Sequence, residues 1–184
     1  MLPGVTTTDA VVPAAVADAA AALAEEQWRV AVLVRSAGSR GRWDAVLDDD
    51  SRWRLIRSGH FVEYSAELAW TPREVVGHLR DSARVFTDRL HRIRTEDDPL
   101  LAGFRTDAPE RLADYRATPV EVLADELRTA QAALLATVAG LVPDDLSRTG
   151  RHETDGPVTV EGLLRFLPEH QRDHAEQLTA LLGR

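Results

Sequence analysis

The sequence predicts an all-α fold, a four-helix bundle with one long crossover connection. Four segments of about 20 residues carry apolar side chains mostly at intervals of three and four residues, the spacing of one face of an amphipathic helix. Threonine and proline mark the starts of these segments, and a long connection separates the second from the third. The length of 184 residues suits one domain, so we expect a single domain over residues 1–184, with residues 1–12 as a flexible N-terminus.

The first helix is expected over about residues 14–35, a stretch of strong helix formers with Pro13 suited to its first turn. Within residues 36–70, residues 52–64 have mixed strand and helix character, and Gly59 favours a break there. We therefore assign residues 36–70 to a loop that contains a short helix or a hairpin.

The second helix has the clearest start signal, because Thr71 is a good N-cap and Pro72 fits the first helical position. Its pattern ends near Thr95, and the turn sequence of residues 97–99 follows. The residues of its apolar stripe are Val75, Leu79, Ala83, Phe86, Leu90 and Ile93.

The third helix repeats this arrangement, with Thr118 as N-cap and Glu121 as the partner in a capping box. Its stripe runs over residues 120–141, and the crossover before it includes a short helix at about residues 109–116. The fourth helix is expected from the N-cap Thr159 to about residue 182.

Charge and composition exclude several classes of function. The formal net charge is −8, which disfavours nucleic-acid binding through a broad basic face. There is no apolar run long enough to cross a membrane and no basic, then apolar, N-terminal signal, so we expect a cytoplasmic protein without membrane contact. The chain contains no cysteine and no lysine, which removes thiolate and Schiff-base catalysis by its own side chains.

The fourth helix breaks the rule of an apolar core. Its heptad stripe begins and ends with apolar residues, but the middle positions are His170, His174 and Gln177. Three polar residues in a core-facing stripe are costly unless something satisfies them. His170 and His174 are spaced i, i+4, so both imidazoles can reach one ion.

A third ligand should come from another helix, and His78 on the flank of the second stripe is the candidate. Three neutral imidazoles would suit Zn, Ni or Fe(II), with open positions for water or substrate. Asp173 is a candidate for a group that supports a ligand or transfers a proton. Pro168 interrupts the helix just before His170, and either a tolerated bend or an opening of the metal pocket would account for it.

Residues 70–79, Trp-Thr-Pro-Arg-Glu-Val-Val-Gly-His-Leu, resemble the second-helix start of the DinB superfamily of metal-binding four-helix bundles, which includes YfiT-like proteins. Residues 149–152, 158–164 and 169–178 resemble the C-terminal signature of the same family. The resemblance implies that His78, His170 and His174 are the metal ligands.

Activities within this family are varied, and the resemblance leaves three functions open. The first is a thiol S-transferase of the mycothiol or bacillithiol type, in which a divalent metal activates a small-molecule thiol for attack on an electrophile. Arg84 and Arg151, with Arg80, are then candidates to bind anionic parts of the substrate, although each could equally be an exposed helix charge. The second is a metal-dependent hydrolase that uses metal-bound water, and the third is a non-catalytic metal-binding protein of stress response or interaction.

The four tryptophans all fall in the first 70 residues. They either pack the N-terminal segment or mark the face of a homodimer.

Overall fold

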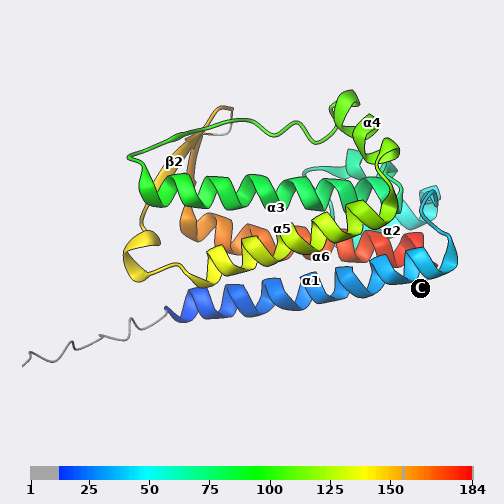
Figure 1. Ribbon diagram of the computed structural model, residues 1–184, viewed down its shortest axis with the longest axis horizontal. Coiled ribbons are helices and arrows are strands. Elements are labelled where there is room, and N and C mark those ends of the chain that lie inside the picture. Colours follow the sequence, from blue (N-terminus) through cyan, green and yellow to red (C-terminus); the bar gives the residue numbers. More distant parts are fainter. Residues whose placement is uncertain (1–12, 155, 184) are drawn as a thin grey trace, which may run out of the picture.

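The structure is a computed structural model that describes residues 13–154 and 156–183. The expectation of a flexible N-terminus at residues 1–12 lies outside the described residues. Within the described part, four long helices form the bundle, and shorter elements lie at its two ends (Figure 1). The long helices are α1 (Ala14–Arg40), α3 (Pro72–Thr95), α5 (Val120–Ala139) and α6 (Val160–Leu181).

The topology confirms the predicted four-helix bundle with a long crossover. Helix α3 packs mainly on α5 and α1 mainly on α6, while contacts of α1 with α5 and of α3 with α6 close the ring. After α3 the chain returns along the length of the bundle before α5 begins, so these two neighbours run in the same direction (Figure 1). This return contains the predicted short helix, α4 (Pro109–Ala117).

Capping explains where the helices begin and end. Thr71 and Glu74 form a capping box at the start of α3, and the Thr159 side chain accepts from Gly162 N–H at the start of α6. The prediction for α5 was wrong in detail, because Pro119 is its N-cap and no side chain caps it. The Thr118 hydroxyl instead donates to the carbonyl of Asp114, which closes the end of α4.

Residues 36–70 contain more helix than the sequence indicated. Helix α1 continues to Arg40 and stops at Gly41, whose left-handed φ of 60° suits glycine. The predicted short helix is α2 (Asp49–Arg57), and a 3-10 helix, η1 (Ser65–Ala69), leads into α3. A further 3-10 turn, η2 (Pro143–Asp145), follows α5.

A small three-stranded sheet among the described residues was not predicted. It consists of β1 (Leu100–Leu101), β2 (Thr149–His152) and β3 (Gly156–Thr159), in the order β1-β2-β3. Strand β2 pairs parallel with β1 and antiparallel with β3. The sheet fastens the start of the crossover to the segment that precedes α6.

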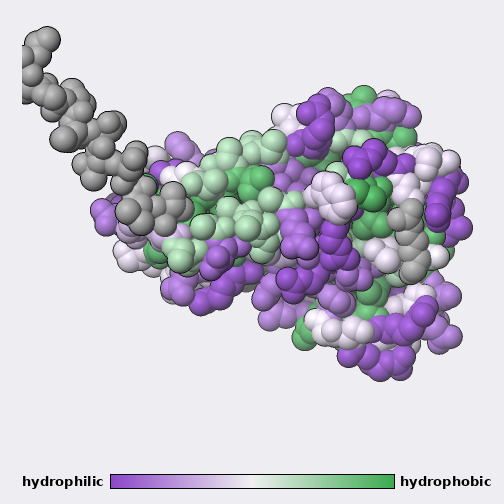
Figure 2. Space-filling view, turned by 90° about the horizontal axis from the view of Figure 1, so that it is seen from below, coloured by the Kyte–Doolittle hydropathy of each residue, from purple (hydrophilic) through white to green (hydrophobic). Residues whose placement is uncertain are grey.

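Two apolar clusters fill the two ends of the bundle. Between them the interior is polar, because buried histidines and glutamines of α1, α3, α5 and α6 occupy the middle. The surface follows a different pattern: Figure 2 shows a largely hydrophobic area near the start of α1 and hydrophilic residues toward the other end. None of the described helices combines the length and apolar character that a membrane crossing requires.

Candidate metal centre

Four buried side chains meet in the polar middle layer: Glu67, His78, His170 and His174. One ligand atom from each of them lies within 4.8 Å of the corresponding atoms of the others. The structure therefore brings together the three histidines that the sequence predicted, and it adds a carboxylate from η1.

Helix α6 presents His170 and His174 on one face, with ring centroids 4.8 Å apart, as the i, i+4 spacing requires. Helix α3 presents His78 from the opposite side, and its Nε2 lies 3.0 Å from His170 Nε2. Two ligand atoms about 2.0–2.1 Å from one ion, at angles of 90–109°, lie about 2.9–3.4 Å apart. The distance between these two nitrogens falls in that range.

Glu67 completes the cluster. Its Oε2 lies 3.4 Å from His174 Nε2 and 3.9 Å from His78 Nε2. Sequence reasoning missed this residue because η1 belongs to the segment whose structure could not be predicted. The available signal was weak: a single acid within the otherwise apolar stretch Ala66-Glu67-Leu68-Ala69, just before the helix that carries His78.

Unpartnered atoms provide the test of whether an ion fits. Among the described residues, Glu67 Oε2 and His174 Nε2 are buried polar atoms without a hydrogen-bond partner, and they lie 3.4 Å apart. Burying such atoms without compensation costs about 1–3 kcal/mol each. Nitrogen and oxygen donors at these separations match the ligands of a divalent cation, so the residues present fit a metal.

The protonation states of His78 and His170 also favour a role as metal ligands. Burial lowers the pKa of both His78 and His170 well below the ordinary value, and the neighbouring His174 lowers it further. Both imidazoles are therefore neutral at pH 7. Neutral imidazoles have the free lone pair that metal binding needs.

An aromatic wall surrounds the cluster, and it includes every phenylalanine of the chain. The closest ring centroid distances are 4.8 Å for Trp70 to His78 and 5.2 Å both for Phe61 to His174 and for Phe166 to His170. Such a wall lowers the local polarity and strengthens electrostatic interactions inside it. Its members are Phe61, Tyr64, Trp70, Phe86, Phe104 and Phe166.

The hydrogen bonds of Asp173 go to residues 60–64 and not to the histidines of the cluster. Its carboxylate accepts hydrogen bonds from Phe61 N–H (3.0 Å) and the Tyr64 hydroxyl (2.6 Å), and it lies 2.7 Å from His60 Nδ1. Asp173 thus clasps residues 60–64, the segment that leads into η1, onto α6. A proton-transfer role for Asp173 stays a prediction.

The predicted substrate arginines lie in ion pairs with carboxylates outside the four-residue cluster. Arg84 is half-exposed and pairs with Glu126 of α5 at 3.4 Å. Arg151 of β2 is exposed and pairs with Asp98 at 2.7 Å. Arg80 is buried, but its guanidinium is bound by three carboxylates, those of Asp81, Asp114 and Glu126.

Two other arginines contact the aromatic wall, and the sequence did not single them out. The Arg111 guanidinium lies over the ring of Phe104, 4.6 Å from its centroid, and Phe104 in turn stacks on His78. Arg89 lies over Phe86 at 5.2 Å. A binding role for Arg84 or Arg151 remains a prediction, whereas Arg111 is the cation that the wall places near His78.

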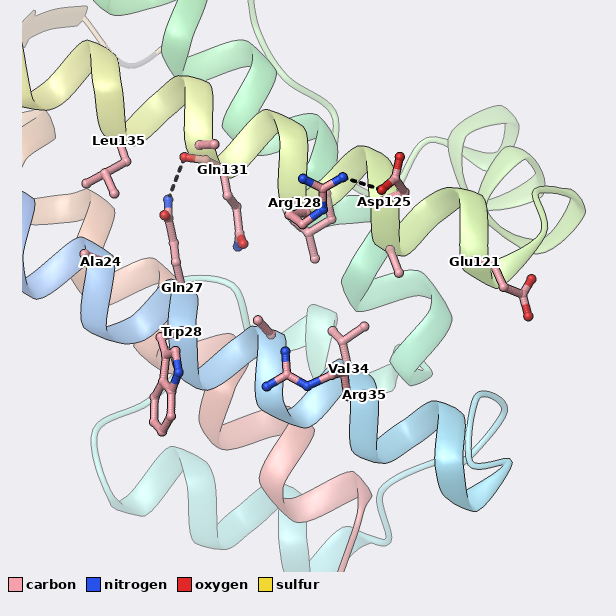
Figure 3. A pocket seen from close by; sticks show the side chains of 14 residues that line it. Ala24, Gln27, Trp28, Val34, Arg35, Glu121, Asp125, Arg128, Gln131 and Leu135 are labelled. Atoms are coloured by element: carbon pink, nitrogen blue, oxygen red, sulfur yellow. Dashed lines mark hydrogen bonds and ion pairs between the residues drawn. The ribbon is translucent and has the colours of Figure 1, made fainter.

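A groove between α1 and α5, with a volume of about 560 Å³, is separate from the cluster (Figure 3). Trp28 flanks it, and at its floor Gln27 donates to the backbone carbonyl of Gln131. Gln131 donates in turn to Gln171 of α6, next in sequence to His170. Gln131 and Gln171 therefore lie between the groove and the histidines.

Several curated proteins are similar to this chain in sequence. The curated proteins that match include a "putative metal-dependent hydrolase" from Oceanobacillus iheyensis, 26% identical over 115 residues, and one from Bacillus mycoides, 27% identical over 115 residues. Each match covers 62% of this chain and 66% of the relative, just under two thirds of the relative's own length.

A solved structure, YfiT from Bacillus subtilis, is described as "a probable metal-dependent hydrolase with an unusual four-helix bundle topology". It matches with a TM-score of 0.72 and 19% identity over 98% of this chain and 91% of that one, which shows a shared fold. The family model of the DinB superfamily matches residues 10–178. This chain therefore belongs to the DinB superfamily.

Proposed function

We propose that this protein is a metal-dependent hydrolase that holds one divalent cation with His78, His170, His174 and Glu67. The observation that carries the proposal is the buried cluster of these four residues, in which the unpartnered atoms Glu67 Oε2 and His174 Nε2 face each other. The names of the Oceanobacillus and Bacillus relatives support the reaction class.

When bound, a divalent cation in such a site polarises a carbonyl and lowers the pKa of a water or thiol that it holds. Imidazoles coordinate a metal in their neutral form, so with three of them and one carboxylate one positive charge of the ion would remain uncompensated. In an enclosure lined by aromatic rings, that charge favours the negative oxygen that develops during hydrolysis of an ester or amide.

The proposal makes Glu67 Oε2 the fourth ligand, and the alternative is that it accepts the proton of the attacking water. Its position 3.4 Å from His174 Nε2 allows either task. A Glu67→Gln variant separates them, because an amide oxygen can still bind a metal weakly but cannot take a proton.

The ion itself is proposed from the chemistry of the donors. Three nitrogens and one oxygen suit Zn or Ni, with Fe(II) as an alternative. The donor set lacks sulfur because the chain has no cysteine.

Thiol S-transfer is the second candidate, and the absence of cysteine is the observation that bears on it. Any thiol at this centre would have to be a separate small molecule, such as mycothiol or bacillithiol. Non-catalytic metal binding is the outcome if neither reaction occurs.

One experiment distinguishes these functions. Zn-, Ni- and Fe(II)-loaded samples are incubated with a panel of esters, amides and model electrophiles, with and without a small thiol. Hydrolysis without thiol, lost in His170→Ala but kept in His91→Ala, supports the hydrolase; His91 is an exposed histidine of the same chain. Strict dependence on thiol would support the transferase instead, and no turnover under any condition would overturn both.

A further inference from the structure

Gln177 is the third polar residue in the core-facing stripe of α6, and the mechanism proposed above does not use it. Its side chain is fully buried. A buried amide in this position would be costly unless its oxygen and nitrogen both found partners. Both do find partners, and both partners belong to residues of the metal cluster.

The Gln177 amide oxygen lies 2.9 Å from His174 Nδ1. An amide oxygen only accepts hydrogen bonds, so this contact requires the proton of His174 to be on Nδ1. The tautomer that results leaves a lone pair on Nε2. His174 Nε2 is the atom that lies 3.4 Å from Glu67 Oε2 and has no hydrogen-bond partner.

The Gln177 amide nitrogen makes the second contact, since it donates to the backbone carbonyl of Glu67 at 2.7 Å. This bond ties η1 to α6 next to the residue that supplies the carboxylate. One side chain therefore sets the ligand atom of His174 and fixes the backbone from which Glu67 reaches the same centre.

We infer that Gln177 is a positioning residue of the metal centre, which orients His174 through its oxygen and Glu67 through its nitrogen. The inference rests on the proposed function, because it concerns the same cluster. Groups that hydrogen-bond a metal ligand typically change metal affinity 10- to 100-fold when they are removed.

The test compares two glutamines of the same helix. Gln177→Met removes both hydrogen bonds with little change in volume. Gln171→Met is the matched control, because Gln171 is equally buried but bonds Gln131 and not a residue of the cluster. Gln177→Glu is the rescue variant, because a carboxyl oxygen can still accept from His174 Nδ1.

Two readouts are measured for the full-length protein. The first is Co(II) affinity, from competition with a chromophoric chelator, together with the Co(II) absorption spectrum. We expect Gln177→Met to bind at least about tenfold more weakly than Gln171→Met, with a changed spectrum, and Gln177→Glu to recover part of the loss. A purely structural role of Gln177 would lower thermal stability but leave affinity and spectrum as in Gln171→Met.

The second readout needs no metal. In the metal-free protein, ¹⁵N chemical shifts of the imidazoles report the tautomer of His174. We expect the Nδ1–H form in the wild type and Gln177→Glu, and a mixture in Gln177→Met.

An unchanged tautomer together with an unchanged Co(II) affinity in Gln177→Met would overturn the positioning role. If the wild type binds no metal, the proposed function fails by itself. The tautomer measurement still decides whether Gln177 orients His174.

Discussion

The close contact between Gly77 and Tyr115 gives a prediction that can be worked from distances. A Cβ added at Gly77 would lie 2.4 Å from Cγ and Cδ1 of Tyr115 and 2.9 Å from Cδ2. Carbon atoms in contact are about 3.5–4.0 Å apart, so Gly77→Ala requires the ring to move by about 1 Å or more. Tyr115 is fully buried, and its hydroxyl donates to Asp81 at 2.9 Å, so the ring cannot retreat without losing that bond.

The expected net effect on stability combines three contributions, two destabilising and one stabilising. Overpacking costs about 1–3 kcal/mol, while the better helix propensity of alanine returns about 1 kcal/mol. Adding the strain on the Tyr115 hydrogen bond, we expect a loss of about 2 kcal/mol in the free energy of unfolding. At about 2–4 °C per kcal/mol for a chain of this size, the melting temperature should fall by about 4–8 °C.

The matched control is Gly38→Ala, also within a helix, where the nearest atom to the added Cβ is Cζ2 of Trp43 at an ordinary 3.7 Å. This variant should gain up to about 1 kcal/mol from helix propensity. Thermal unfolding followed by circular dichroism measures both. If Gly77→Ala raises the melting temperature as Gly38→Ala does, Tyr115 of α4 does not pack closely on Gly77 of α3, and the reasoning is refuted.

Three further predictions concern the centre and the segment that covers it. In the metal-free folded protein, the pKa values of His78 and His170 are lowered, so below about pH 6.5 the unfolded chain binds protons that the folded chain does not. The urea concentration at the midpoint of unfolding should therefore fall as the pH drops from about 6.5 to about 5. A midpoint independent of pH would contradict the burial of these imidazoles. Asp173→Ala removes the clasp on residues 60–64 and should cost about 2–3 kcal/mol and speed proteolysis of that segment, whereas unchanged cleavage would show that other contacts hold it. Glu67→Gln should reduce hydrolysis about 10²- to 10⁴-fold while metal is retained if Glu67 acts as a base, and parallel loss of metal would identify it as a ligand.

The long helices could be predicted because each buries one continuous stripe, and burial of that stripe sets the period of the pattern. The same logic exposed His170, His174 and Gln177, since polar residues in a core-facing stripe require partners. Of their partners, His78 could be predicted from its place on the flank of the second stripe, whereas Glu67 could not. Glu67 and Gln177 meet only because η1 packs on α6, a contact between residues 110 positions apart.

The bounds of helix α2 and the small sheet could not be predicted, for physical reasons. Helix α2 has nine residues and only one buried side chain, Leu55, so it lacks an apolar stripe. Strand β1 has two residues, too few for an alternating pattern.

The distance of Arg84 from the centre could have been expected from the helix period. Six residues after His78, at about 100° per residue, place it about 240° around α3. The structure accordingly pairs Arg84 with α5 and not with the histidines.

The central claim is that the four buried side chains hold a metal ion. It is tested most directly by elemental analysis of protein purified without chelators, for the wild type, His170→Ala and the control His91→Ala. The account predicts about one divalent ion per chain in the wild type and in His91→Ala, and a large loss in His170→Ala. A wild-type protein without stoichiometric metal that also fails to take up Zn, Ni, Co or Fe(II) would contradict it.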